Sequence, residues 1–167
     1  MKMSERGIAA LKQQEGCIKI DGKHVIYDDA TGKPVPAGAP LPAGATIGYG
    51  HLVKPSEDFR GGITEAAATD LLRNDIAAAE RAVQNNITVP LAQNQYDALV
   101  MLAYNIGSGA FANSTVIQYI NNPDTVSSKY PNLKSAWGAW NKSGGRVMQG
   151  LVNRRDYEFR IYNTGAY

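Results

Sequence analysis

Glu15 and the neighbouring Asp28 and Asp29 are the side chains whose type and spacing could do chemistry. Hydrolysis of a glycosidic bond uses one carboxyl group to protonate the leaving oxygen and a second one as base or nucleophile. The acid has to stay protonated near neutral pH, which apolar or anionic surroundings favour. The sequence predicts a helix from about Glu5 to Gln14 that ends at Gly16, so Glu15 would lie where the helix dipole disfavours a negative charge. A single Glu or Asp is more commonly a solvated surface charge, so this interpretation needs support from further sequence motifs.

The histidines and the single cysteine offer fewer kinds of chemistry. Because His24, His51 and Cys17 are the only residues of these types, the sequence contains no zinc-binding constellation and allows no intrachain disulfide. This argues against a zinc amidase or metallopeptidase, and we expect neither a metal nor a cofactor. His51 could titrate near neutral pH or could anchor a sheet to the helices by a polar contact. Cys17 is either a small buried side chain or a reactive thiol.

The elements that would position the carboxylates fall into two parts of the chain. In residues 17–62, the turn signal Asp21-Gly22 separates β-branched runs and is followed by a Pro/Gly/Ala-rich stretch, which favours a small antiparallel sheet. From Thr64 onward the apolar residues recur at helical spacing, with Thr64 as the cap of the first helix. The predicted helices cover residues 65–85, 90–106, 114–120, 130–140 and 147–162. The expected fold is therefore α+β, with a small sheet lobe, a larger helical lobe and a cleft between them.

Length and composition fit a single domain made of these two lobes, residues 1–62 and 63–167. Seventeen Lys and Arg against 15 Asp and Glu give a net charge of only +2, a weak bias that names no partner. The arginines near the C-terminus are not interleaved with base-stacking aromatics, so we expect no nucleic-acid partner. The apolar runs are too short for a signal peptide or a membrane span.

Three motifs follow one another in the first third of the chain: Glu15-Gly16 after the first helix, Tyr27-Asp28-Asp29 after the hairpin, and Thr-Ile-Gly-Tyr-Gly-His at 46–51. Together they resemble the lysozyme family of tailed bacteriophages, the T4-type lysozymes or endolysins of glycoside hydrolase family 24. Residues 98–115 are similar to that family's central helix and glycine-rich turn. Residues 150–162 are similar to its C-terminal signature. The resemblance spans nearly the whole chain and implies a lysozyme-like fold.

Carried over residue by residue, the resemblance implies that Glu15 is the general acid and Asp29 the second carboxylate. Thr46 matches the threonine beside the catalytic water of an inverting mechanism, and Asp28 remains a competitor for the role of Asp29. The spacings from Glu15 to Asp29 and from Asp29 to Thr46 are longer than in shorter family members. These insertions fall where loops tolerate extra length, so the assignment of the catalytic residues is unchanged.

Leu52, Tyr104 and Ser114 match saccharide-binding positions of the family. Gly50 could let the backbone approach a sugar closely, although a tight turn would also explain it. Tyr104 lies on a helix predicted to be buried, so it could equally be a core aromatic. The resemblance also favours the structural role for His51.

The function implied by the resemblance is bacteriolytic cleavage of peptidoglycan at the β-1,4 bond between N-acetylmuramic acid and N-acetylglucosamine. A lytic transglycosylase needs one Glu and no water-activating carboxylate, and Asp29 with Thr46 argues against it. A wall-binding module without catalysis is the other alternative. A phage or prophage enzyme of this kind is expected to be a monomer that waits in the host cytoplasm. A holin would then release it to the cell wall.

Overall fold

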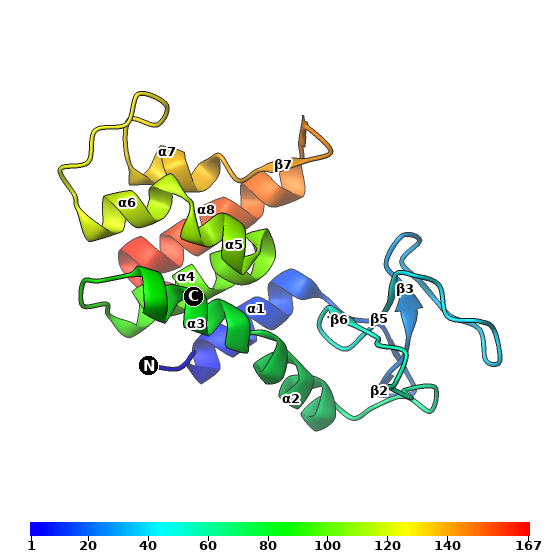
Figure 1. Ribbon diagram of the computed structural model, residues 1–167. Helices are drawn as coiled ribbons and strands as arrows, with labels where there is room; N and C mark the ends of the chain where they lie inside the picture. The colour runs from blue at the N-terminus through cyan, green and yellow to red at the C-terminus, as the bar shows by residue number, and fades with distance from the viewer. The chain divides into compact units, whose positions relative to one another are not determined.

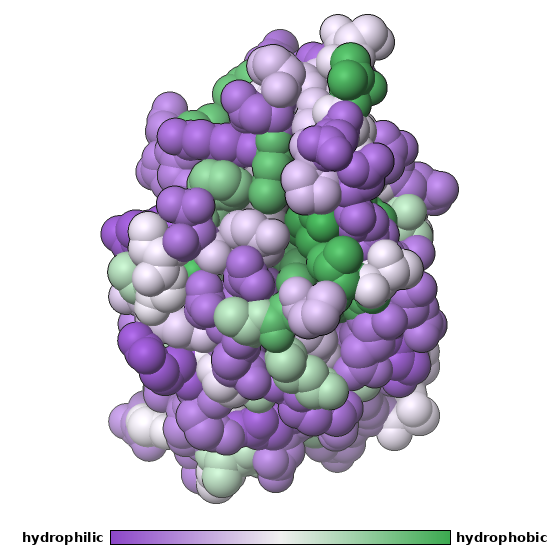
Figure 2. Space-filling view, turned by 90° about the vertical axis from the view of Figure 1, so that its left-hand side faces the viewer, coloured by the Kyte–Doolittle hydropathy of each residue, from purple (hydrophilic) through white to green (hydrophobic).

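The computed structural model describes residues 1–167, which form two compact units (Figure 1). The sheet unit is Lys12–Asp75, and the helical unit joins Met1–Leu11 to Ile76–Tyr167. The first helix, α1 (Glu5–Glu15), begins in the helical unit and ends in the sheet unit. No helix is both long enough and apolar enough to cross a membrane. The face drawn in Figure 2 is largely hydrophilic, with hydrophobic residues in smaller areas between.

Short antiparallel strands make up the sheet unit, and one helix, α2, closes it. The elements are β1 (Lys19–Ile20), β2 (Lys23–His24), β3 (Tyr27–Asp28), β4 (Lys33–Pro34), β5 (Ala45–Ile47), β6 (His51–Leu52) and α2 (Glu65–Asp75). Strands β1 and β2 form a hairpin, and the other four pair in the order β4-β3-β5-β6. Helix α2 packs against β2 and β6. The predicted small antiparallel sheet is therefore confirmed.

The hairpin turn at Asp21-Gly22 forms as the sequence predicts. Both residues have positive φ, 51° for Asp21 and 77° for Gly22, as a two-residue turn between right-twisted strands requires. An Asp-Gly pair tolerates this backbone, since Asp is among the few side chains that visit the left-handed region and Gly enters it freely.

A small apolar core lies on one face of the four-stranded sheet. It consists of the buried residues Ile26, Ala45 and Ile47, with partly buried residues packed against them. Successive side chains of a strand point to opposite faces, so Thr46, between Ala45 and Ile47, points away from this core. The core therefore fixes which face of β5 carries the hydroxyl group.

The helical unit is built around α4 (Gln93–Ile106), whose residues from Tyr96 to Ala103 are all buried. Helix α4 packs against α8 (Gln149–Thr164), α3 (Ala77–Asn86) and α5 (Ser108–Ala112). The remaining elements are α6 (Thr115–Asn121), α7 (Leu133–Gly138) and the short strands β7 (Lys142–Ser143) and β8 (Arg146–Val147). The predicted α+β fold class is confirmed.

Helix boundaries follow their capping residues. The Ser4 hydroxyl accepts from the Gly7 N–H at 3.0 Å, and the Thr64 hydroxyl accepts from the Ala67 N–H at 3.1 Å. These contacts satisfy amide groups that have no partner inside the first turn of a helix. The two sequence-predicted caps therefore hold α1 and α2 at their starts.

Three local features differ from the sequence prediction. The helix predicted over 65–85 is two helices, because the chain breaks between α2 and α3 at Ile76. Helix α5 follows α4 directly after Gly107, which has φ 93°. A hairpin, β7–β8, lies between the last two helices, where Gly144 and Gly145 both have the positive φ of a tight turn.

Candidate active site

Strands β3 and β5 bring Asp29 and Thr46 to the same carbonyl group. In their antiparallel register Tyr27 pairs with Thr46 and Asp28 with Ala45. The next backbone contact is the Asp29 N–H, which donates to the Gly44 carbonyl oxygen at 3.0 Å. The Thr46 hydroxyl donates to that same oxygen at 2.9 Å. The Asp29 backbone and the Thr46 side chain are thus fixed by one acceptor.

Tyr27, Thr46 and Leu52 form a row across the sheet. Thr46 pairs with Tyr27 on one side and with Leu52 on the other, so the three side chains project from the same face. Tyr27 and Thr46 are nearly covered, whereas Leu52 is 58% exposed. Gly50, just before β6, is exposed with φ 89°. The predicted residues Thr46 and Leu52 are therefore direct neighbours, with Gly50 in the adjoining turn.

Glu15 is the last residue of α1 and is half-buried. The helix ends after it because Gly16 adopts φ 66°, with its N–H donating to the Lys12 carbonyl at 3.1 Å. This is the helix end that the sequence predicts. The Glu15 carboxyl group therefore comes from a rigid helix, while Asp29 and Thr46 come from the sheet.

Tyr27 lies within the electrostatic influence of both predicted catalytic carboxylates. Burial raises the pKa of the Tyr27 phenol, and the negative charges of Asp29, Glu15 and Cys17 raise it further. A carboxylate opposes a phenolate only when the two groups are near each other. Glu15 and Asp29 therefore both act electrostatically on Tyr27, which the sequence indicates only as part of a motif.

Asp28 and Asp29 have different surroundings. The half-buried Asp28 carboxylate accepts the Ala30 N–H at 3.0 Å, and its carbonyl accepts from Thr31 and Gly32. Asp28 thus holds the turn after β3. The Asp29 side chain is exposed and takes part in no hydrogen bond or ion pair. Of the two carboxylates, that of Asp29 is therefore the more accessible to a ligand.

The other two predicted substrate residues lie in the helical unit. Tyr104 is half-buried on α4. Ser114 immediately precedes α6, and its hydroxyl oxygen is buried without a hydrogen-bond partner. Tyr104 therefore offers accessible surface, whereas the Ser114 hydroxyl does not.

His51 joins β6 to neighbouring acidic groups. Its Nδ1 lies 2.8 Å from Asp75 at the end of α2, and its Nε2 lies 2.9 Å from Glu57. Burial lowers the pKa of His51, but the hydrogen bonds to Glu57 and Asp75 outweigh it and the net pKa is raised. Both ring nitrogens therefore act as donors, and His51 ties the sheet to α2 as the structural interpretation expects.

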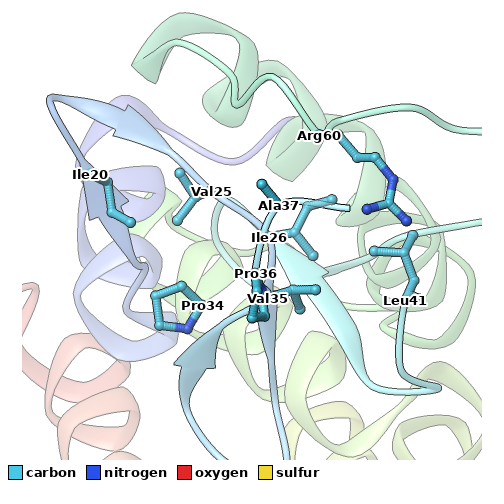
Figure 3. A pocket seen from close by; sticks show the side chains of 9 residues that line it. All are labelled: Ile20, Val25, Ile26, Pro34, Val35, Pro36, Ala37, Leu41 and Arg60. Carbon is cyan, nitrogen blue, oxygen red and sulfur yellow. The ribbon is translucent and has the colours of Figure 1, made fainter. Parts of the chain in front are cut away.

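A pocket of about 210 Å³ in the sheet unit contains none of these residues (Figure 3). Its lining is apolar apart from Arg60 and includes Ile26, Val35 and Leu41 beside the sheet core. No group of three or more His, Cys, Asp or Glu side chains is arranged to hold a metal ion.

Comparisons with known proteins identify relatives over most of this chain. The sequence pattern of the phage lysozyme family matches residues 18–158. The endolysin of Bacillus phage PZA is 44% identical over 126 residues, 72% of this chain and 45% of that protein. The endolysin of Salmonella phage P22 is 35% identical over 147 residues, 86% of each chain. The solved endolysin from Escherichia coli O157:H7 phage FAHEc1 superposes with a TM-score of 0.76 at 32% identity, covering 100% of this chain and 96% of that one.

The matches cover different shares of this chain and of its relatives. The chain spans about half the length of the Bacillus phage relative, 45% of it. The family match nevertheless covers most of the chain, and the Salmonella phage relative matches across nearly the full length of both proteins. The chain therefore belongs to the phage lysozyme family.

Proposed function

We propose that the protein is an endolysin-type peptidoglycan hydrolase, a muramidase that cleaves the β-1,4 bond between N-acetylmuramic acid and N-acetylglucosamine. The observation that carries the proposal is the convergence of Asp29 and Thr46 on the Gly44 carbonyl, with Glu15 and Asp29 both acting on Tyr27. Two carboxyl groups near each other are the minimum that glycoside hydrolysis needs. Membership in the phage lysozyme family supports the choice of substrate.

In this mechanism Glu15 donates its proton to the glycosidic oxygen as the bond to the sugar's anomeric carbon breaks. A water attacks that carbon from the opposite face and gives its proton to Asp29, which inverts the anomeric centre. Because the Thr46 hydroxyl proton is committed to the Gly44 carbonyl, its oxygen lone pairs remain to accept a hydrogen bond from the water. Thr46 would thus orient the attacking oxygen and not donate to it.

The finer assignment to T4-type lysozymes of glycoside hydrolase family 24 belongs to the same proposal. It rests on the Glu15-Gly16, Tyr27-to-Asp29 and 46–51 motifs. We further propose that Gly50, Leu52 and Tyr104 contact the saccharide directly, because each is at least partly accessible. Ser114 would contribute less, since its hydroxyl is buried.

The cellular context is also a proposal. The chain would act as one lysozyme-like domain and as a monomer, without nucleic acid, metal or cofactor. It would remain in the host cytoplasm until a holin releases it to the wall. The release by a holin follows from the family resemblance, and size-exclusion chromatography with light scattering tests the monomer.

Product analysis tests the reaction itself. Purified peptidoglycan is incubated with the protein, and the soluble fragments are reduced and analysed by mass spectrometry. A hydrolase leaves a reducing N-acetylmuramic acid end that borohydride reduces, whereas a lytic transglycosylase leaves a non-reducing anhydro sugar. Reducible ends support the proposal. Anhydro ends would support the transglycosylase, and wall binding without fragments would support a non-catalytic module.

A further inference from the structure

Glu65, the first residue of α2, is the centre of a cluster of four donors, which we call the Glu65 cluster. Its Oε1 lies 2.8 Å from Lys12 Nζ, and its Oε2 lies 3.0 Å from Lys19 Nζ. Oε2 also lies 2.7 Å from His24 Nε2, and the Tyr49 hydroxyl lies 2.7 and 2.9 Å from the two oxygens. One carboxylate therefore satisfies four side chains from four different segments.

Two of these segments bracket Glu15. Lys12 lies three residues before Glu15 on α1, so the two side chains share one side of the helix. Lys19 begins β1, a few residues after Glu15. Glu65 thus holds the chain on both sides of the predicted acid.

The other two segments lead to the sheet residues. His24 ends β2, and its side chain is 0% exposed. The next strand is β3, and Asp29 directly follows it. Tyr49 lies in the turn after β5, the strand that contains Thr46. The His24 and Tyr49 rings also meet edge to face, with centroids 5.0 Å apart. The Glu65 cluster therefore touches the helix that ends at Glu15, the strand that precedes β3 and the turn that follows the strand of Thr46.

The charges of the cluster support this arrangement. Burial opposes ionisation of Glu65, but the hydrogen bonds from Lys12, His24, Tyr49 and Lys19 outweigh it and lower the pKa of Glu65. Burial and the hydrogen bond to Glu65 raise the pKa of the Tyr49 phenol, so Tyr49 stays a neutral donor. Glu65 is therefore an anion that accepts from all four partners at once.

An ordinary explanation exists for part of this pattern. An acidic residue in the first turn of a helix interacts favourably with the helix dipole. That interaction needs no contact with other segments, and the Glu65 side chain is 46% exposed, so each ion pair on its own adds little stability. The convergence of four segments on one carboxylate is what the dipole does not explain.

We propose that Glu65 is a positioning residue that fixes the relative placement of the segments bearing Glu15, Asp29 and Thr46. This inference rests on the proposed function, because it assigns Glu65 a part in the same reaction. Glu65 need not touch the substrate. It acts by holding the acid and the water-binding residues in register, and small displacements of such groups are costly to the rate.

The test compares Glu65→Gln with wild type in clearing purified peptidoglycan, each well below its own unfolding midpoint. Gln keeps the size of the side chain but loses the charge and one acceptor oxygen. We expect the rate at saturating wall concentration to fall about tenfold or more, because misplacement of about 1 Å can cost 100-fold. The half-saturating concentration should change less than about twofold, since substrate contacts are retained.

The matched control is Glu80→Gln in the helical unit. Like Glu65, Glu80 is a carboxylate with converging donors, the Lys2 ammonium group and the Met3 N–H, each at 2.8 Å, although its side chain is buried. We expect Glu80→Gln to lower the unfolding midpoint without changing the rate per folded molecule. If Glu65→Gln behaves in the same way, Glu65 is merely structural and the proposal is overturned.

A second variant keeps the test valid if Glu65→Gln does not fold. Tyr49→Phe removes one donor of the cluster and keeps the ring, and we expect a smaller fall in the saturated rate with unchanged half-saturation. If folded Tyr49→Phe has the same saturated rate as wild type, the positioning role is overturned. An inactive but folded wild type would instead overturn the proposed function, which distinguishes the two failures.

Discussion

The adjacent residues Asp28 and Asp29 differ in the exposure and hydrogen bonding of their side chains. Sequence reasoning left both open as the second carboxylate. The Asp28 carboxylate is engaged by the Ala30 N–H, whereas the Asp29 side chain is exposed and its backbone is held by Gly44. Side chains alternate along β3 and the turn that follows it, and this gives the two carboxylates different surroundings. No motif encodes that difference.

We predict that Asp29→Asn loses about 100-fold or more in the rate of peptidoglycan clearing, the usual scale for loss of a general base. Asp28→Asn should retain most of the activity, because its amide oxygen can still accept the Ala30 N–H. Initial clearing rates of both variants check this. If Asp28→Asn were the inactive variant, the register assigned to the hairpin would be wrong by one residue.

Thr46 gives a second prediction at this scale. Thr46→Val keeps the shape of a side chain that is 5% exposed but removes the hydroxyl, so we expect clearing to slow about tenfold or more. Thr46→Ser retains the donor to Gly44 and should stay near wild type. Equal rates for the two variants would exclude a role for the hydroxyl in orienting water.

At the scale of elements, short sequence motifs correctly predict turns, helix ends and helix caps. The Asp21-Gly22 turn, the end of α1 at Gly16 and the caps Ser4 and Thr64 all appear as expected. The break at Ile76 was not predictable, because no Pro or Gly marks it and the alanine-rich sequence around it favours a continuous helix.

The ion pairs of His51 join β6 to α2 and should make stability depend on pH. A raised His51 pKa means that this stabilisation is complete below the unfolded value of about 6.5 and is lost as pH rises through the folded value. Glu57, whose pKa is lowered by the Lys54 backbone N–H and by His51, adds stabilisation above about 4.5 that is lost at lower pH. The full contribution therefore lies between these two values.

We expect His51→Gln to lower the unfolding free energy at both pH values, and the loss should be about 1 kcal/mol larger at about pH 5.5 than at about pH 9. The value is modest because the carboxylate partners are partly exposed. Urea unfolding at both pH values measures this. A difference independent of pH would mean that His51 contributes through packing and not through its charge.

At the scale of the whole molecule, the ends of the chain meet in the helical unit around Asp97 on α4. Asp97 is fully buried and accepts from the Ser4 N–H and hydroxyl, from Gln93 and from the Tyr167 hydroxyl. The sequence could not predict this, because Ser4 and Tyr167 lie 93 and 70 residues from Asp97. The contacts of Glu65 join residues 16 to 53 positions apart, so local patterns do not predict them either.

Asp97→Asn should lower the unfolding free energy by about 1–3 kcal/mol, because buried donors lose their acceptor. The exposed Asp124→Asn makes the same change of charge and should be close to neutral. Urea unfolding measures both. At temperatures where both are folded, we expect wild-type clearing rates, so a large loss of activity in folded Asp97→Asn would contradict the division between stability and catalysis.

The most direct test of the central claim is the rate of reducing-end release from purified peptidoglycan by wild type, Glu15→Gln and Glu5→Gln. Glu5 lies at the start of the same helix and makes a matched loss of charge. We predict release by wild type and Glu5→Gln, and a loss of about 100-fold or more in folded Glu15→Gln. Wild-type release by Glu15→Gln would show that another residue supplies the proton and would contradict the assignment of Glu15.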